Sequence, residues 1–226
     1  MANQITHIVL AKKMGEEFLN KFDQSAFLVG TIFPDVRYLK VVDREKTHFN
    51  GLSLKDVLDE KNSFIAGMKY HSLVDEVREK YLVDRNIYSL IPSSRFITQA
   101  LKIYEDEVLY SNVSDWDQVI AFLGRELNEE IELVEQIDKV KAWYLILQKY
   151  FKKEPTDESR KDFILGVGFS EEIAAEINSL ISTMRQTPEV REIILNLYQD
   201  WGSLVTTKKA DLVPHDEEYA LIINNK

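Results

Sequence analysis

The chain has 226 residues, of which 45% are hydrophobic, and its formal net charge is −10 at neutral pH. Duplex nucleic acid and anionic membrane surfaces bind basic patches, so this charge argues against both as partners. No apolar run approaches the roughly 18 residues of a membrane-spanning helix, and the absence of cysteine excludes disulfides and thiolate metal ligands. A zinc ion would have to use carboxylates and the four histidines, which are His7, His48, His71 and His215.

We expect one large domain, because no shift of composition divides the chain. Residues 1–207 are the predicted helical domain and residues 208–226 a C-terminal tail that docks on the body or contacts a partner. The first residues lack the basic start and the continuous apolar core of a secretory signal. This predicts a cytoplasmic protein, or one that is exported by another route.

The first two predicted helices lead to a turn. Apolar residues recur at helical spacing from Thr6 to Phe22, with His7 in the first turn. The apolar stretch Ser25–Phe33 predicts a buried helix that ends at Pro34, since proline disfavours the helical conformation in the preceding residue. Asp35 then lies at a turn or helix start, either as a capping residue or as an acidic group beneath an apolar wall.

Residues 36–52 are irregular and predict a loop that contains His48. A lone histidine in a loop is usually solvated, but loops carried by rigid helices are also where ligands bind. Ser53 is predicted to cap a short helix that ends near Lys61. The central helix is predicted to run from about Ser63 to Arg85.

The central helix carries the pair that we take as the core of a candidate site. His71 and Asp75 are four residues apart, so they lie on one face of the helix, in line with the apolar residues Phe64 and Met68. Both should therefore point toward the core. A buried carboxylate needs a hydrogen-bond donor, a cationic side chain or a metal ion. Taken alone, such a pair is more often a histidine satisfied by an aspartate than a metal site.

The rest of the chain predicts helices without recognisable chemistry. The acidic run Glu105-Asp106-Glu107 is interpreted as a solvated face, or as a source of one further metal ligand. Because no segment alternates as a strand does, the predicted fold class is all-α. The predicted helices run from Ser93 or Ser94 to Tyr110, from Ser114 past Phe122, from Leu127 to Lys153, and over residues 159–166, 170–185 and 188–205.

Four pieces of the first third together resemble the zinc-dependent phospholipase C family, whose fold is all-helical. The resemblance covers about residues 5 to 80. The pieces are Thr6-His7, the run from Phe27 to Asp35 with its Gly30 and Pro34-Asp35, Thr47-His48-Phe49, and Gly67 followed by His71-x-x-x-Asp75.

The resemblance implies a metal site built from these pieces. Asp35, His48, His71 and Asp75 would form the principal site, and His7 would add a neighbouring one that Asp75 can bridge. Imidazoles and carboxylates are suitable ligands for a divalent cation. No histidine between His71 and His215 is available to complete the three-zinc set of secreted members. We therefore expect one or two zinc ions, with manganese or magnesium as other possibilities, and His7 within roughly 10 Å of Asp75.

The activity that the resemblance implies is metal-dependent hydrolysis of a phosphoester. Asp35 or Asp75 would orient or deprotonate the attacking water. The substrate would be a phosphodiester such as a phospholipid head group, or another small phosphoester. The alternative is a helical interaction protein that keeps the family fold with a structural metal and has no catalytic activity.

Overall fold

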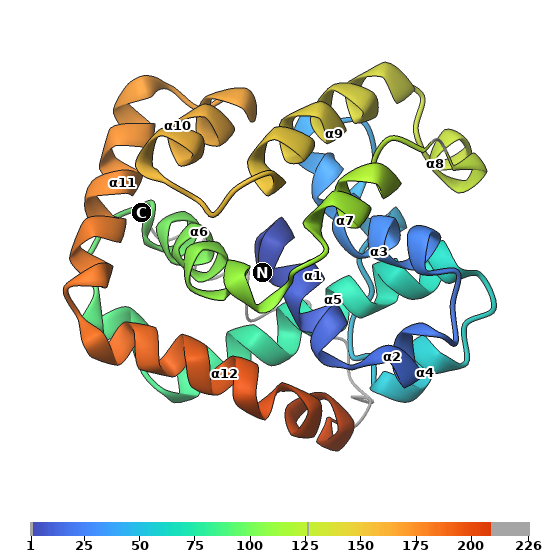
Figure 1. Ribbon diagram of the computed structural model, residues 1–226, viewed down its shortest axis with the longest axis horizontal. Helices are drawn as coiled ribbons and strands as arrows, with labels where there is room; N and C mark the ends of the chain where they lie inside the picture. Colours follow the sequence, from blue (N-terminus) through green and yellow to red (C-terminus); the bar gives the residue numbers. More distant parts are fainter. Residues whose placement is uncertain (1, 126, 209–226) are drawn as a thin grey trace.

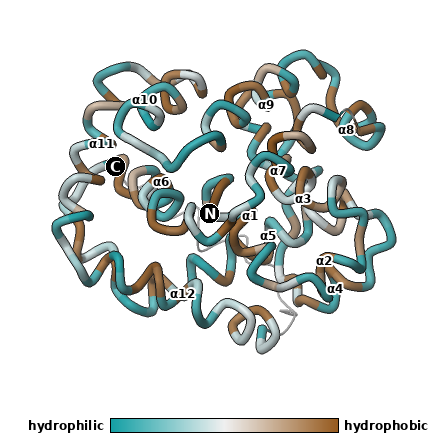
Figure 2. The backbone as a smooth tube through the Cα atoms, viewed as in Figure 1, coloured by the Kyte–Doolittle hydropathy of each residue, from teal (hydrophilic) through white to brown (hydrophobic). Residues whose placement is uncertain are grey.

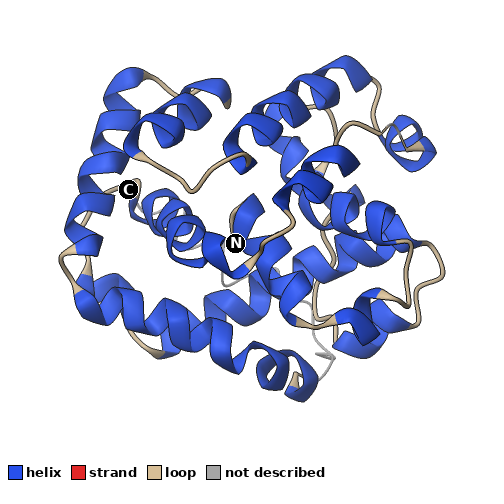
Figure 3. Ribbon diagram, viewed as in Figure 1, coloured by secondary structure: helices blue, strands red, loops and turns tan. Residues whose placement is uncertain are grey.

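The computed structural model describes residues 2–125 and 127–208. Within these residues the chain forms twelve α-helices and four short 3-10 helices, and no strand is found (Figure 3). The all-α class and the single multi-helix domain are thereby confirmed for the described part. The predicted tail lies outside the described residues except for Lys208, and His215 lies outside them too.

The helices follow one another with short connections. In the first half they are α1 (Gln4–Lys13), α2 (Glu16–Leu19), α3 (Gln24–Ile32), η1 (Phe33–Leu39), η2 (Arg44–Lys46), α4 (Leu54–Leu58), α5 (Ser63–Asp84), η3 (Ile87–Leu90), α6 (Ile97–Leu109), η4 (Tyr110–Asn112) and α7 (Trp116–Phe122). In the second half they are α8 (Asn128–Leu133), α9 (Ile137–Phe151), α10 (Asp157–Gly166), α11 (Glu171–Arg185) and α12 (Pro188–Thr207).

Several helix boundaries follow the predicted signals. α5 has nearly the predicted bounds, and its N-cap Asn62 accepts hydrogen bonds from two backbone N–H groups of the first turn. Ser53 and Asp56 form a capping box at the start of α4. Ser170 caps α11, and α12 begins with Pro188, a residue suited to the first position of a helix.

Two predicted long helices are each divided in the structure. The predicted helix Thr6–Phe22 is split at Gly15, whose φ of 86° is incompatible with a right-handed helix. The predicted helix over residues 127–153 is split near Val134, which is extended with φ −125° and ψ 141°. The apolar spacing continues across both breaks, so periodicity alone predicted a single helix in each case.

The segment that follows α3 is also more helical than predicted. Pro34 does not end the helical path, because it lies in the first turn of η1, where the missing N–H group is not needed. Residues 36–52, predicted as a loop, contain most of η1 and the whole of η2. α6 and α7 begin beyond the serines that were predicted to cap them.

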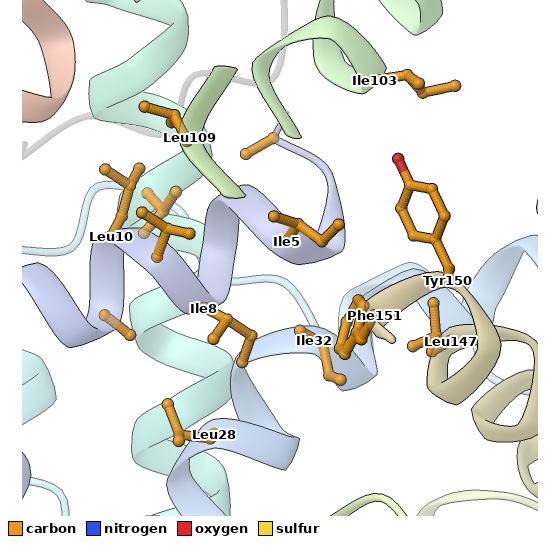
Figure 4. Close-up of a cluster of buried hydrophobic side chains, with 14 of the residues drawn as sticks. Ile5, Ile8, Leu10, Leu28, Ile32, Ile103, Leu109, Leu147, Tyr150 and Phe151 are labelled. Carbon is orange, nitrogen blue, oxygen red and sulfur yellow. The ribbon is translucent and has the colours of Figure 1, made fainter. Parts of the chain in front are cut away.

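α1 lies in the middle of the molecule, and its residues from Gln4 to Ala11 are buried (Figure 1). It packs against α3, α5, α6 and α12. Figure 4 shows Ile5 and Ile8 of α1 in the apolar cluster that also includes Ile32 and Phe151. The polar residues of this helix, including His7, are therefore held inside the domain by the apolar residues around them.

The outer helices are amphipathic. Along α11 and α12 hydrophobic and hydrophilic residues alternate (Figure 2). On α12 the inward positions recur every three or four residues, as one face of a helix requires; they are Val190, Ile194, Leu197, Trp201 and Val205. None of the helices in the described part of the chain is both long enough and apolar enough to cross a membrane.

α3 and α5 form the most extensive helix pair, and two glycines let their backbones touch. A Cβ atom on Gly30 would lie 2.1 Å from the carbonyl oxygen of Phe64, and one on Gly67 would lie 2.2 Å from that of Phe27. Only glycine fits at these positions. The crossing places Thr31 of α3 beside His71 of α5, one helical turn after Gly67.

We predict that Gly67→Ala lowers the free energy of unfolding by about 3 kcal/mol or more, because the methyl group meets rigid backbone. Gly202→Ala is the matched control, since no atom lies within 4 Å of its added Cβ and it too is inside a helix. Urea unfolding of both variants measures the difference. Equal stability of the two variants would contradict the close crossing of α3 and α5.

Candidate metal centre

The structure brings together all five residues that the sequence analysis selected. His7 comes from α1, Asp35 from η1, His48 from the segment after η2, and His71 and Asp75 from α5. Ligand atoms of His7, His71 and Asp75 lie within 4.8 Å of one another, and so do those of Asp35, His48 and His71. His71 belongs to both groups, so the five side chains form one continuous cluster.

The cluster is compact and almost completely buried. His7 Nε2 lies 3.4 Å from Asp75 Oδ1, and His71 Nε2 lies 3.4 Å from Asp75 Oδ2. The expected proximity of His7 and Asp75 is thereby confirmed. The rings of His7 and His71 stack at 4.0 Å, and His48 meets His71 edge-on at 5.1 Å. Asp75 is the most exposed of the five at 9%.

The backbone of α3 fixes the tautomer of His71. Nδ1 of His71 lies 2.9 Å from the carbonyl oxygen of Thr31. A carbonyl oxygen only accepts hydrogen bonds, so Nδ1 carries a proton, and in the neutral ring Nε2 presents its lone pair to the cluster. Histidines that bind metals are usually oriented by such a bond from the other ring nitrogen.

His48 is oriented in a comparable way by its own loop. The Thr47 hydroxyl donates to the carbonyl oxygen of Arg44 and lies 3.0 Å from Nδ1 of His48. Since that hydroxyl hydrogen is engaged with Arg44, Nδ1 of His48 donates to Thr47 Oγ1 and Nε2 keeps its lone pair. The next residue, Phe49, donates its backbone N–H to Ser72 Oγ on α5. This bond anchors the loop beside His71.

The two carboxylates are held by the start of the chain. Gln4 Nε2 donates to Asp35 Oδ2 at 2.7 Å, and the backbone N–H of Ala2 donates to Asp75 Oδ1 at 2.6 Å. α1 therefore supplies both His7 and a group that positions Asp35. Gln4 carried no recognisable pattern in the sequence, because its partner is 31 residues away.

Several polar atoms of the cluster are buried without a hydrogen-bond partner. Burying such an atom unpaired costs about 1–3 kcal/mol, so native structures contain few of them and they are rarely clustered. These atoms are both ring nitrogens of His7, Nε2 of His48, Nε2 of His71 and Oδ1 of Asp35. A bound cation would accept an electron pair from one nitrogen of each ring and from the carboxylate oxygen, whereas the other nitrogen of a neutral imidazole carries a proton. Buried histidine and aspartate side chains at this position can thus hold a metal ion.

The electrostatics of the metal-free protein keep His7 and His48 neutral at neutral pH, whereas they favour protonation of His71, which would release that proton when it binds a metal. Burial, with the charge of His71, lowers the pKa of His7 to about 4 and that of His48 to about 2. Burial also acts to lower the pKa of His71, but the charge of Asp75 outweighs it and the pKa of His71 is raised. Burial acts to raise the pKa of Asp75, but the charges of the N-terminus and of His71 outweigh it and hold this pKa well below its usual range.

Lys102 on α6 is a further charged group near the cluster that the sequence analysis missed. Its side chain is buried, with 9% of the residue exposed. Burial lowers the pKa of Lys102, and the charges of Asp35 and Asp75 act in the opposite direction. One signal was available in the sequence, since Lys102 lies one helical turn before the acidic residues Glu105 and Asp106 and shares their face.

The acidic run is neither a solvated face nor part of the two candidate ligand groups. Glu105 is buried, and its two carboxylate oxygens accept hydrogen bonds from Nε and Nη2 of the buried Arg78, at 2.8 and 2.6 Å. Asp106 accepts from the backbone N–H and the hydroxyl of Thr6 and from Asn3 Nδ2. Glu107 pairs with arginines of α10 and α11. Asp106 therefore fixes the start of α1, and with it the position of His7.

Comparison of the chain with family models, with curated proteins and with solved structures finds no match. The residue pattern and the geometry of the cluster are therefore the grounds for interpreting this site.

We predict that the metal-free protein takes up at least one zinc ion per chain in calorimetric titration. His71→Ala should weaken the affinity by more than about a hundredfold, since it removes the nitrogen shared by both groups and loss of a merely orienting group costs 10–100-fold. His215→Ala is the control, because it removes a histidine that is outside the sequence pieces that supply the ligand candidates. Equal weakening in both variants would show that zinc binds elsewhere.

A second prediction concerns Asp106, because burial raises the pKa of its carboxyl from 3.8 to about 7. A raised pKa in the folded state means that this group stabilises the fold when protonated, and that the contribution is lost as pH rises through about 7. The permanently neutral Asp106→Asn variant should gain stability relative to the wild type between about pH 5 and pH 8. Urea unfolding at both pH values measures this, and a pH-independent difference would contradict it.

Proposed function

We propose that the cluster binds one or two divalent cations, with zinc preferred, and that the protein is a metal-dependent phosphoesterase of the phospholipase C type. The observation that carries this proposal is the convergence of unpartnered imidazole nitrogens and a carboxylate oxygen from α1, η1, the His48 loop and α5. Zinc is preferred because a cysteine-free set of neutral imidazoles and carboxylates suits its ligand chemistry. Manganese and magnesium remain the other candidates, although magnesium favours oxygen ligands.

A cation at this position supplies Lewis acidity, which polarises a phosphoryl oxygen and makes a water more acidic. The side chains provide the remaining functions. Asp35 has one oxygen fixed by Gln4 and the other unpaired, so it is suited to orient the attacking water and accept its proton. Asp75 is the second candidate for this role. Lys102 is suited to stabilise the negative charge that develops on the phosphoryl group.

The substrate class follows from this chemistry and from the resemblance of the first third of the chain. We propose a phosphodiester, such as a phospholipid head group, or another small phosphoester. The protein's acidic character argues against duplex nucleic acid. A cytoplasmic location stays a prediction from the N-terminal sequence.

The near-complete burial of the ligands favours a second candidate function. His7 and His71 have no exposed surface, and structural zinc sites are usually closed in this way whereas catalytic sites keep an open position. The alternative is therefore a helical interaction protein whose metal stabilises the fold. Asp75 and His48 keep 9% and 7% of their surface exposed, and this exposure supports the catalytic function over the closed structural site.

We predict that His48→Ala and His71→Ala each abolish phosphodiester hydrolysis while the helical circular dichroism stays largely unchanged, because the apolar core does not depend on these rings. Asp35→Asn should also reduce activity steeply, since it removes the charge and the proton acceptor but keeps the shape. His215→Ala should keep wild-type activity.

A panel of phosphodiesters and phosphomonoesters assayed with zinc, manganese and magnesium measures these effects. If the wild type hydrolyses none of them and His71→Ala unfolds, the metal is structural and the interaction protein is the better interpretation.

A further inference from the structure

A cleft of about 440 Å³ lies beside the segment that carries Asp35 and His48. Its walls come from η1, from η2 and the residues between them, and from the end of α8 and the connection to α9. The charged side chains that line it are Arg37, Lys40, Arg44, Lys46, Asp43 and Glu135. None of the five clustered metal-ligand candidates lines this cleft, so it is a separate feature of the surface.

The charge of the cleft is opposite to that of the protein. Four cationic side chains line it against two carboxylates, in a chain whose net charge is −10. A concave surface with a net positive charge raises the local concentration of anionic ligands. An acidic protein therefore presents here a site for an anion.

The same segment of the chain, from η1 through η2 to His48, supplies residues to both the cleft and the metal cluster. Arg37 follows Asp35 by two residues within η1. The carbonyl oxygen of Arg44 accepts the hydrogen bond from Thr47, whose hydroxyl orients His48. The backbone N–H of His48 donates to the same carbonyl oxygen at 2.9 Å. The cleft is therefore built on the same segment that positions Asp35 and His48.

The backbone at Lys40 adds an independent observation. Lys40 ends η1 in the left-handed region, with φ 57° and ψ 40°. Non-glycine residues other than asparagine and aspartate are uncommon there, and such strain is found most often at ligand-binding sites. Lys40 is one of the four cationic residues that line the cleft, although glycine would be the easier residue for this turn.

We propose that this cleft binds a second phosphate group of the substrate, so that the substrate class is a phosphoester carrying a further phosphate beyond the scissile bond. The inference rests on the proposed function of the metal cluster and narrows it. The cationic groups available to bind it are those of Arg37, Lys40, Arg44 and Lys46. The second phosphate can belong to a soluble compound or to a phosphorylated lipid head group.

The test measures anion binding without turnover. Inorganic pyrophosphate is titrated calorimetrically into the metal-free wild type, into Lys40→Gln/Lys46→Gln, and into the control Lys80→Gln/Lys161→Gln. The control lysines are exposed side chains that pair with Asp84 and Glu171, and it changes the net charge equally. We expect about tenfold weaker binding in the cleft variant only, and weaker binding at higher salt.

A second arm separates the two sources of the phosphate. The same proteins are sedimented with phosphatidylcholine vesicles that contain a phosphorylated phosphatidylinositol. Binding to these vesicles that is lost in the cleft variant and kept in the control assigns the site to a lipid head group. Pyrophosphate binding without vesicle binding assigns it to a soluble compound. Equal binding by the cleft variant and the control in both arms would overturn the proposal.

The activity assay keeps this inference distinct from the proposed function. The assay compares kcat/KM for a substrate that carries a distal phosphate with kcat/KM for a substrate that lacks it. With metal supplied, the ratio of these two values should be about tenfold lower in the cleft variant than in the wild type. If hydrolysis occurs and this ratio is unchanged, the cleft assignment fails and the phosphoesterase stands. If no hydrolysis occurs but pyrophosphate binding depends on the cleft lysines, the anion site stands and the phosphoesterase fails.

Discussion

The close crossing of α3 and α5 is the constraint on which the candidate site depends. Gly30 and Gly67 have no side chains to separate the two helices, so each backbone lies against a carbonyl group of the other. This contact brings the carbonyl oxygen of Thr31 within 2.9 Å of His71 and thereby turns Nε2 of His71 toward Asp75. A wider crossing would break this bond and leave the imidazole free to rotate. The helix contact therefore sets the tautomer and the direction of the nitrogen at the centre of the cluster.

Burying the cluster without a ligand costs free energy of folding, and contacts with the surrounding structure hold its residues in place. Two carboxylates and three imidazoles are buried together, while α1 is held in place by Asp106, whose partners are a hundred residues away in sequence. Unpaired buried nitrogens and oxygens weaken a fold unless a ligand compensates them. A bound cation would compensate the charge of the carboxylates and would be coordinated by the ring nitrogens. A metal site therefore explains why these groups are buried together. The cationic side chains of Lys102, Arg37 and Arg44 are consistent with the phosphoester substrate that we propose.

Much of this arrangement could be predicted from local patterns, and the remainder depends on contacts between distant residues. Apolar periodicity and caps predicted α5, α11 and α12 closely, and the spacing of His71 and Asp75 placed both on one inward face. The breaks at Gly15 and Val134 were missed because the apolar spacing continues across them. Gln4 and the buried pair of Arg78 with Glu105 could not be predicted, since their partners are brought close only by the fold. The basic cleft was missed for the same reason, because its far wall comes from the end of α8 and the connection to α9.

Anomalous diffraction at the zinc absorption edge, from crystals grown with zinc, tests the central claim most directly. If the five side chains form a metal centre, an anomalous peak should lie about 2.0–2.1 Å from Nε2 of His71, with oxygens of Asp75 or Asp35 at similar distances. A second peak between His7 and Asp75 would show that two ions are bound. Strong peaks at surface carboxylates only, with Nε2 of His71 hydrogen-bonded to water, would contradict the assignment of a metal centre.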